Sequence, residues 1–141
     1  MTVNPDHKHA YASADQRGAV WERWVALRNG DFDQADEIVA PAVAVHVPAV
    51  DGRPHPASGK RALLSWVAAM RAVCPDGRLV TRVGPIISGD LVAGRWELIR
   101  PGRSDPVTGT DIVRVAGGRV VEFWANHDLL GAALPLGPIA A

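Results

Sequence analysis

The second half of the chain alternates hydrophobic and polar residues with the period of a β-strand. This pattern predicts four strands, over residues 78–87, 91–99, 108–116 and 119–128. The first two strands are separated by Ser88-Gly89-Asp90 and the last two by Gly117-Gly118, which are typical of tight hairpin turns. We therefore expect an antiparallel meander of four strands.

The first half of the chain has mainly helical periodicity. Apolar residues three and four positions apart predict helices over residues 13–29, 33–40 and 58–74. Alternating Val43, Val45 and Val47 predict one strand before the third helix. Helices followed by an antiparallel meander indicate an α+β fold, in which about three helices pack on one face of a curved sheet.

The length and composition indicate one globular domain. The chain has 141 residues, of which 48% are hydrophobic and 21% charged, as in an ordinary soluble protein. We assign the domain to residues 13–141 and expect residues 1–12, which are polar, to form a disordered tail. Because neither a signal-peptide pattern nor a run of about 18 apolar residues is recognisable, a cytoplasmic protein is expected.

Charge and cysteine content exclude several classes of function. Lys and Arg total 15, as do Asp and Glu, so the formal net charge is zero and neither nucleic acid nor a membrane is an expected partner. Cys74 is the single cysteine, so it allows no internal disulfide, and we expect it to be a small buried side chain. No metal-ligand spacing or phosphate-binding glycine loop is present, and we expect no metal and no cofactor.

Polar residues, among them Asp111 and Asp128, interrupt the otherwise apolar predicted strands. Alternation along the last strand places Trp124, Asn126 and Asp128 on one face. A two-residue turn at Gly117-Gly118 would put Asp111 opposite Trp124 on that face, whereas a bulge would turn the Asp111 side chain to the other face. These four residues are therefore candidates to share one site.

Arg95 and Glu97 share a face of their own strand. Carboxylates gathered around one arginine in an apolar pocket can hold one acid protonated and another ionised, although such charges can also be simply solvated. If Asp128 is catalytic, we expect it to be desolvated beside Arg95 or Glu97. Open exposure with an ordinary pKa would instead favour a binding or surface role.

Two further residues are candidates for a pocket. His46 interrupts the valine pattern of the first strand and could be a second acid/base or a pocket donor, or else a core histidine bonded to a carbonyl group. Trp66 on the third helix, like Trp124, is either core or a wall that contacts substrate. We expect His55 and His127 to lie on the surface.

Several segments resemble the SnoaL-like polyketide cyclases and ester cyclases over about residues 18–137. They include Gly89-Asp90-Leu91-Val92-Ala93-Gly94-Arg95-Trp96, Gly118-Arg119-Val120-Val121-Glu122-Phe123-Trp124 and Asp128-Leu129-Leu130-Gly131. The resemblance implies the cone-shaped α+β barrel of the NTF2-like superfamily, a homodimer, and a cofactor-free pocket for a hydrophobic substrate between the sheet and the helices.

The same resemblance implies a cyclase of secondary metabolism and a mechanism for its reaction. The acid at the position of Asp128 would be the general acid/base of an intramolecular aldol closure, and Asn126 would line the site, although it stands where well-known cyclases have histidine. On this view, Asp128→Asn should abolish turnover.

A partial similarity to limonene-type epoxide hydrolases supports an alternative. Arg95-Trp96-Glu97 followed by Asp128 is similar to that family's Arg and two acids, which open an epoxide with water. The residues that orient the water in that family are replaced here by Ala44 and His46. Because an epoxide-opening cyclisation needs no water, an epoxide-opening cyclase is a variant of this alternative. A non-catalytic small-molecule binding module is a third possibility.

Overall fold

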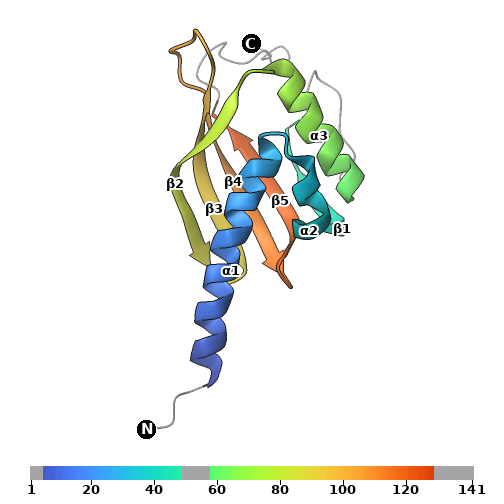
Figure 1. Cartoon of the computed structure of the whole chain (residues 1–141), viewed down its shortest axis with the longest axis vertical. Coiled ribbons are helices and arrows are strands. Elements are labelled where there is room, and N and C mark those ends of the chain that lie inside the picture. The colour runs from blue at the N-terminus through green and yellow to red at the C-terminus, as the bar shows by residue number, and fades with distance from the viewer. Residues whose placement is uncertain (1–4, 49–57, 129–141) are drawn as a thin grey trace.

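In the computed structural model, which describes residues 5–48 and 58–128 and their side chains from residue 16 on, three α-helices cover one face of a five-stranded sheet (Figure 1). The order of elements is α1 (Pro5–Arg28), a short 3-10 turn (Phe32–Gln34), α2 (Ala35–Ile38), β1 (Val39–His46), α3 (Lys60–Val73), β2 (Arg78–Ser88), β3 (Leu91–Ile99), β4 (Thr108–Ala116) and β5 (Arg119–His127). The α+β class is confirmed.

The sheet has the strand order β1-β5-β4-β3-β2. Strands β2 to β5 form the predicted antiparallel meander, with Gly117 and Gly118 at φ of 59° and 75° in the last turn, as a two-residue hairpin of this kind requires. Strand β1 joins the other edge and runs parallel to β5, which makes the sheet mixed. Side-chain alternation does not report strand direction, so this pairing was not predictable from the pattern.

Two elements begin well away from their predicted starts. Helix α1 begins at Pro5, eight residues before the expected start at Ser13, because proline is well accepted in the first helical turn. Strand β1 begins at Val39 and includes Pro41, which we expected to end a helix. An edge strand tolerates proline because its N–H need not pair. Residues 49–57, which include His55, and the chain beyond Asp128 lie outside the described residues.

The core lies between the sheet and the helices and is built around tryptophan. Trp21 and Trp24 of α1 and Trp66 of α3 are buried against the sheet. Two strand glycines make room for indole rings: an added Cβ would lie 2.1 Å from the Trp21 ring at Gly94 and 2.2 Å from the Trp96 ring at Gly109. The close contact of these rings with the strand backbone therefore depends on glycine at both positions.

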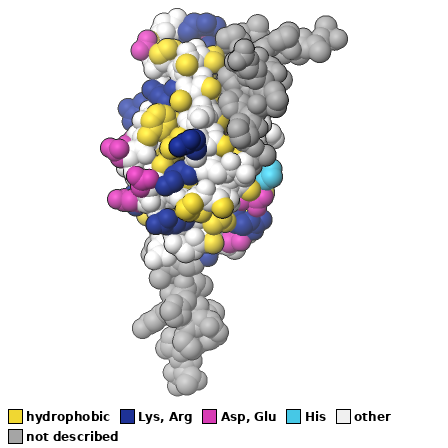
Figure 2. Space-filling model, turned by 90° about the vertical axis from the view of Figure 1, so that its right-hand side faces the viewer, with side chains coloured by type: hydrophobic (Ala, Val, Ile, Leu, Met, Phe, Trp, Pro, Cys, Tyr) yellow, Lys and Arg dark blue, Asp and Glu magenta, His cyan; other side chains and the backbone are white. Residues whose placement is uncertain are grey.

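The surface carries both signs of charge. On the face shown in Figure 2, acidic and basic side chains are interspersed with scattered hydrophobic ones rather than gathered by sign. This mixture fits the balanced composition. None of the described helices is long and apolar enough to cross a membrane.

Two glycine substitutions should have opposite effects on stability. In Gly109→Ala the new methyl group meets the Trp96 ring at 2.2 Å and the Asn126 carbonyl oxygen at 2.5 Å, so we expect a loss of about 1–3 kcal/mol in the free energy of unfolding. In Gly18→Ala the methyl group meets nothing within 4 Å on a helix, and a gain of up to about 1 kcal/mol is expected. Urea denaturation measures both, and an unchanged Gly109→Ala would contradict this packing.

Candidate functional site

The predicted site residues divide between the two faces of the sheet. Along β5, Phe123 and Ala125 are buried under the helices, whereas Trp124 and Asn126 face the uncovered side, as the alternation predicted. We call these the helix-covered face and the outer face. Asp128, Arg95, Glu97, His46, Trp124 and Asn126 belong to the outer face, and Asp111 and Trp66 to the helix-covered side.

The prediction that Asp111 shares a face with Trp124 is wrong. Asp111 pairs with Ala125, and Ile112 takes the position opposite Trp124. An irregularity between Arg114 and Val115 shifts the register by one residue. Because side chains alternate, this shift turns the carboxylate of Asp111 toward the helices.

Asp128 forms an ion pair on the outer face. Its Oδ2 accepts hydrogen bonds from Arg95 Nη2 at 2.5 Å and from Thr108 Oγ1 at 2.7 Å. These two donors lower the pKa of Asp128 below its usual value, so the group is a carboxylate at neutral pH. Asp128 thus lies beside Arg95, as expected for a catalytic acid, but it is not desolvated, since 37% of its side chain is exposed.

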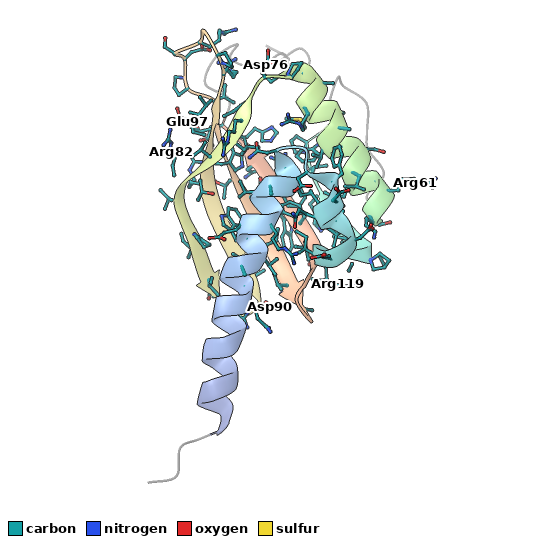
Figure 3. All side chains as sticks on the ribbon, viewed as in Figure 1. Arg61, Asp76, Arg82, Asp90, Glu97 and Arg119 are labelled. Atoms are coloured by element: carbon teal, nitrogen blue, oxygen red, sulfur yellow. The ribbon has the colours of Figure 1, made fainter. Side chains whose placement is uncertain are left out.

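Glu97 does not join this pair. It accepts a hydrogen bond from Arg82 at 2.8 Å, and Figure 3 shows the two side chains close together at the edge formed by β2 and β3. Arg95 bonds to Asp128 and to Thr110 instead. The described residues therefore do not assemble the Arg, Glu and Asp trio that an epoxide hydrolase would need.

The remaining outer-face candidates line a pocket of about 720 Å³. His46 stacks on the Trp124 ring at 5.2 Å between centroids and hydrogen-bonds Glu122 through Nε2 at 2.8 Å. Asn126, Thr110 and Ile112 form the floor beside Trp124. The volume is within the range of small-molecule sites, which is about 300–1,000 Å³.

On the helix-covered side, Asp111 forms the centre of a buried polar cluster. The residue is 1% exposed, and its carboxylate accepts hydrogen bonds from Trp24 Nε1 and Trp96 Nε1, both at 2.9 Å, and from Arg28 Nε at 2.8 Å. Arg28, itself 3% exposed, packs its guanidinium over the ring of Trp66 at 4.7 Å. Three residues already donate hydrogen bonds to the Asp111 carboxylate. The predicted contact between Asp111 and a substrate is therefore not favoured.

His127 lies half-buried beside this cluster with both ring nitrogens inside, so the prediction that it is a surface residue is wrong. Its ring stacks on Trp66 at 6.1 Å and meets Trp96 edge-on at 5.3 Å. Neither ring nitrogen, although buried, has a hydrogen-bond partner within the described part of the chain. Burial, followed by the positive charge of Arg28, lowers the pKa of His127 to about 4, so the imidazole is neutral at neutral pH.

Three of these residues had signals that could have identified them. Alternation places His127 on the same face as Phe123 and Ala125, which is the face that carries the core. Trp24 and Arg28 are four residues apart and thus lie on one side of a helix.

Trp66, predicted to contact substrate, is fully buried and donates its indole N–H to the Pro48 carbonyl group at 3.1 Å. No metal-binding group of three or more His, Cys, Asp or Glu occurs among the described residues.

Asp111→Asn should destabilise the protein strongly. The variant leaves the buried Arg28 charge without its carboxylate, and breaking a buried pair in this way costs about 3–5 kcal/mol. Glu97→Gln is the matched control, because it breaks an exposed pair with Arg82, which is worth less than about 1 kcal/mol. Equal urea midpoints for the two variants would refute the anchoring role of Asp111.

The stability of the protein should depend on His127 between about pH 6.5 and 4. Its folded pKa is about 4 and an unfolded histidine has a pKa of about 6.5, so in this range the unfolded chain binds more protons. Stability is therefore highest above pH 6.5 and falls as the pH drops toward 4, by about 3 kcal/mol at most. His127→Gln should remove this part of the pH dependence of urea unfolding, and an unchanged profile would show that His127 is not held neutral.

The comparisons with known proteins agree with the fold. A sequence model described as SnoaL-like domain matches residues 21–123, which is most of the chain. The solved structure of IdmH from Streptomyces antibioticus, a candidate polyketide cyclase, is 27% identical, with a TM-score of 0.64 over 82% of this chain and 91% of that protein.

A candidate isomerase of the SnoaL-like family from Agrobacterium tumefaciens is 21% identical, with a TM-score of 0.69 over 81% of this chain and 98% of that one. A Xanthomonas campestris protein with a cystatin-like fold is 20% identical, with a TM-score of 0.63 over 77% and 88% of the two chains. No curated protein matches the sequence. Because the SnoaL-like domain model matches most of its length, this chain belongs to the SnoaL-like domain family and has an NTF2-like fold.

Proposed function

We propose that this protein is a cofactor-independent enzyme that uses acid–base chemistry to close a ring in a hydrophobic small molecule. Membership of the SnoaL-like family supports this class of reaction, and so does the 27% identity to IdmH, which is itself described as a candidate polyketide cyclase. A shared fold does not fix a function, so the proposal depends on the chemistry of the site.

The observation that carries the proposal is the state of His127. A neutral imidazole has one nitrogen that donates a proton and one that accepts a proton. Both are buried, and no described residue occupies either of them. An unpaired buried polar group costs about 1–3 kcal/mol, and such groups are rare unless a ligand, a water molecule or a reaction uses them. We infer that the substrate supplies the missing partner.

The ring closure would be an aldol reaction. The acceptor nitrogen of His127 takes a proton from a carbon next to a carbonyl group, and the resulting enolate carbon attacks a second carbonyl carbon of the same molecule. The new alkoxide oxygen then takes the proton back from the imidazolium, so the product has the mass of the substrate. The nearby charge of Arg28, which already lowers the pKa of His127, also favours a negatively charged enolate.

The low pKa of His127 restricts the substrate. A base whose conjugate acid has a pKa of about 4 is weak, and proton transfer is efficient only when the two pKa values are not far apart. The reacting carbon must therefore be unusually acidic, as it is between two carbonyl groups.

The outer-face acid offers a weaker case. Asp128 is the proton carrier that the family resemblance implies, and this role stays a prediction. Its pKa is lowered by Arg95 and Thr108 and its side chain is 37% exposed, so it resembles a solvated ion pair more than a tuned acid. The homodimer that the resemblance implies also stays a prediction.

Paired variants of the two neighbouring residues test the proposal. We expect His127→Gln to lower the rate of ring closure by roughly 10²–10⁴-fold, because the amide does not accept and return a proton. Asp128→Asn should keep most of the activity, since its carboxylate lies on the other face. The substrates are methyl esters with several β-keto groups, and the product is an isomer that is separated by chromatography and has unchanged mass.

A second measurement separates chemistry from folding. Exchange of the acidic carbon-bound protons with deuterated solvent reports proton abstraction alone, and thermal unfolding shows whether each variant is folded. If Asp128→Asn loses activity and His127→Gln keeps it, the reaction takes place on the outer face and the role of His127 is wrong.

A further inference from the structure

Arg28 places a positive charge inside the protein, close to the residue that we propose as the base. Its side chain is 3% exposed, and its guanidinium carbon lies 4.7 Å from the ring centre of Trp66 and 5.7 Å from that of Trp96. Both of these rings also contact His127. The guanidinium of α1 and the imidazole at the end of β5 therefore share two aromatic neighbours.

Asp111 engages only part of this guanidinium. Its Oδ2 accepts a hydrogen bond from Arg28 Nε at 2.8 Å, and its Oδ1 accepts one from Nη2 at 3.4 Å. Among the residues that the structure describes, none accepts a hydrogen bond from the third nitrogen, Nη1. Arginine has donors and no acceptor, and a donor left unpaired in so buried a side chain is costly. Nη1 therefore needs an oxygen atom that this part of the chain does not provide.

A small cavity lies beside Arg28. It measures about 30 Å³, which is room for one water molecule or one oxygen atom of a ligand. Its lining is mainly apolar and includes Met70, Val73, Leu79, Trp96 and Leu98. Two other polar side chains line it, but Asn29 is bound to the Leu79 backbone, at 2.8 and 2.9 Å, and Arg71 to backbone carbonyl groups. Of these three polar side chains, Arg28 is the buried one, so its free nitrogen is the donor that is best shielded from solvent.

A preorganised donor beside a base suits an enolate. When a carbon next to a carbonyl group loses its proton, the negative charge moves to the carbonyl oxygen, and a donor already positioned at that oxygen stabilises the transition state. Asp111 keeps the guanidinium in place and balances its charge, so an uncharged ketone can enter without facing an unpaired buried ion. The Nη1 donor then acts most strongly once the charge develops.

We propose that Arg28 is a second catalytic residue, whose Nη1 donates a hydrogen bond to the carbonyl oxygen next to the carbon that His127 deprotonates. This inference rests on the proposed ring closure, and it adds direct contact with the substrate to the effect of the Arg28 charge. Arg28 stays protonated throughout, since the proton moves from the carbon to the imidazole and from there to the new alkoxide oxygen. Asp111 does not touch the substrate and holds the guanidinium in position.

Two small diones test the contact by titration calorimetry. At neutral pH, 1,3-cyclohexanedione is present largely as its enolate, whereas 2,2-dimethyl-1,3-cyclohexanedione has no proton between its carbonyl groups and stays uncharged. The enolate carries negative charge on the oxygen that would lie beside Nη1. We therefore expect the native protein to bind the enolate more tightly than the dimethyl dione, by roughly ten-fold or more.

Variants identify the donor. Arg28→Met/Asp111→Asn removes it without changing the net charge and without leaving an unpaired buried ion, so the preference for the enolate should fall by roughly five-fold or more. Arg82→Met/Glu97→Gln, which removes an exposed ion pair, is the matched control and should keep the preference. His127→Gln should also keep it, because Arg28 is intact. Thermal unfolding shows which variants are folded, and Arg28→Gln/Asp111→Asn replaces the first variant if that one is not.

The outcomes separate this contact from the reaction at His127. Equal binding of the two diones by the native protein, binding of neither, or an enolate preference that survives in a folded Arg28 double variant would each overturn the role of Arg28. Solvent deuterium exchange would still measure proton abstraction by His127. If His127→Gln keeps both that exchange and the enolate preference, the proposed base is wrong while the Arg28 donor stands.

Discussion

The buried carboxylate of Asp111 is the contact on which the position of α1 over the sheet depends. It receives donors from Trp24 and Arg28 of α1 and from Trp96 of β3, so one side chain of β4 connects a helix and a neighbouring strand. A carboxylate buried without these donors would cost several kcal/mol, and so would the unpaired guanidinium. Trp24 and Arg28 are one helical turn apart, so rotation of α1 would remove both donors at once. The cluster therefore favours a single orientation of the helix.

The same cluster determines the surroundings of His127. Arg28 packs over Trp66 at 4.7 Å and Trp96 at 5.7 Å, and these are the two rings that flank the imidazole. The rings exclude water from His127, and the Arg28 charge opposes its protonation, although Asp111 and Asp128 act in the opposite direction. A group that stabilises the fold thus also contributes to the protonation state of the residue that we propose to be catalytic.

Local signals predicted the strands well and the relations between strands less well. The bounds of β3 and β4 and both hairpin turns agree with the alternation and the turn residues. The face on which Asp111 lies does not agree with the prediction, because the bulge near Arg114 changes the register by one residue and leaves little trace in the sequence. The parallel pairing of β1 with β5 depends on the whole chain path rather than on a local pattern. A histidine at a strand end carries no signal of burial by itself; the signal for His127 lies in the core residues Phe123 and Ala125, which share its face.

The end of β5 presents two titratable side chains in two different environments. His127 and Asp128 are adjacent, and the two-residue period sends them to opposite sides of the sheet. Solvent and Arg95 keep the outer residue ionised, whereas burial keeps the inner residue neutral with both nitrogens free of described partners. Exchanging their faces by a one-residue slip would bury a carboxylate next to Asp111 and expose the imidazole. The register set by Asp111 and its donors opposes that slip, so the same buried contact that positions α1 also decides which of the two groups faces the helices.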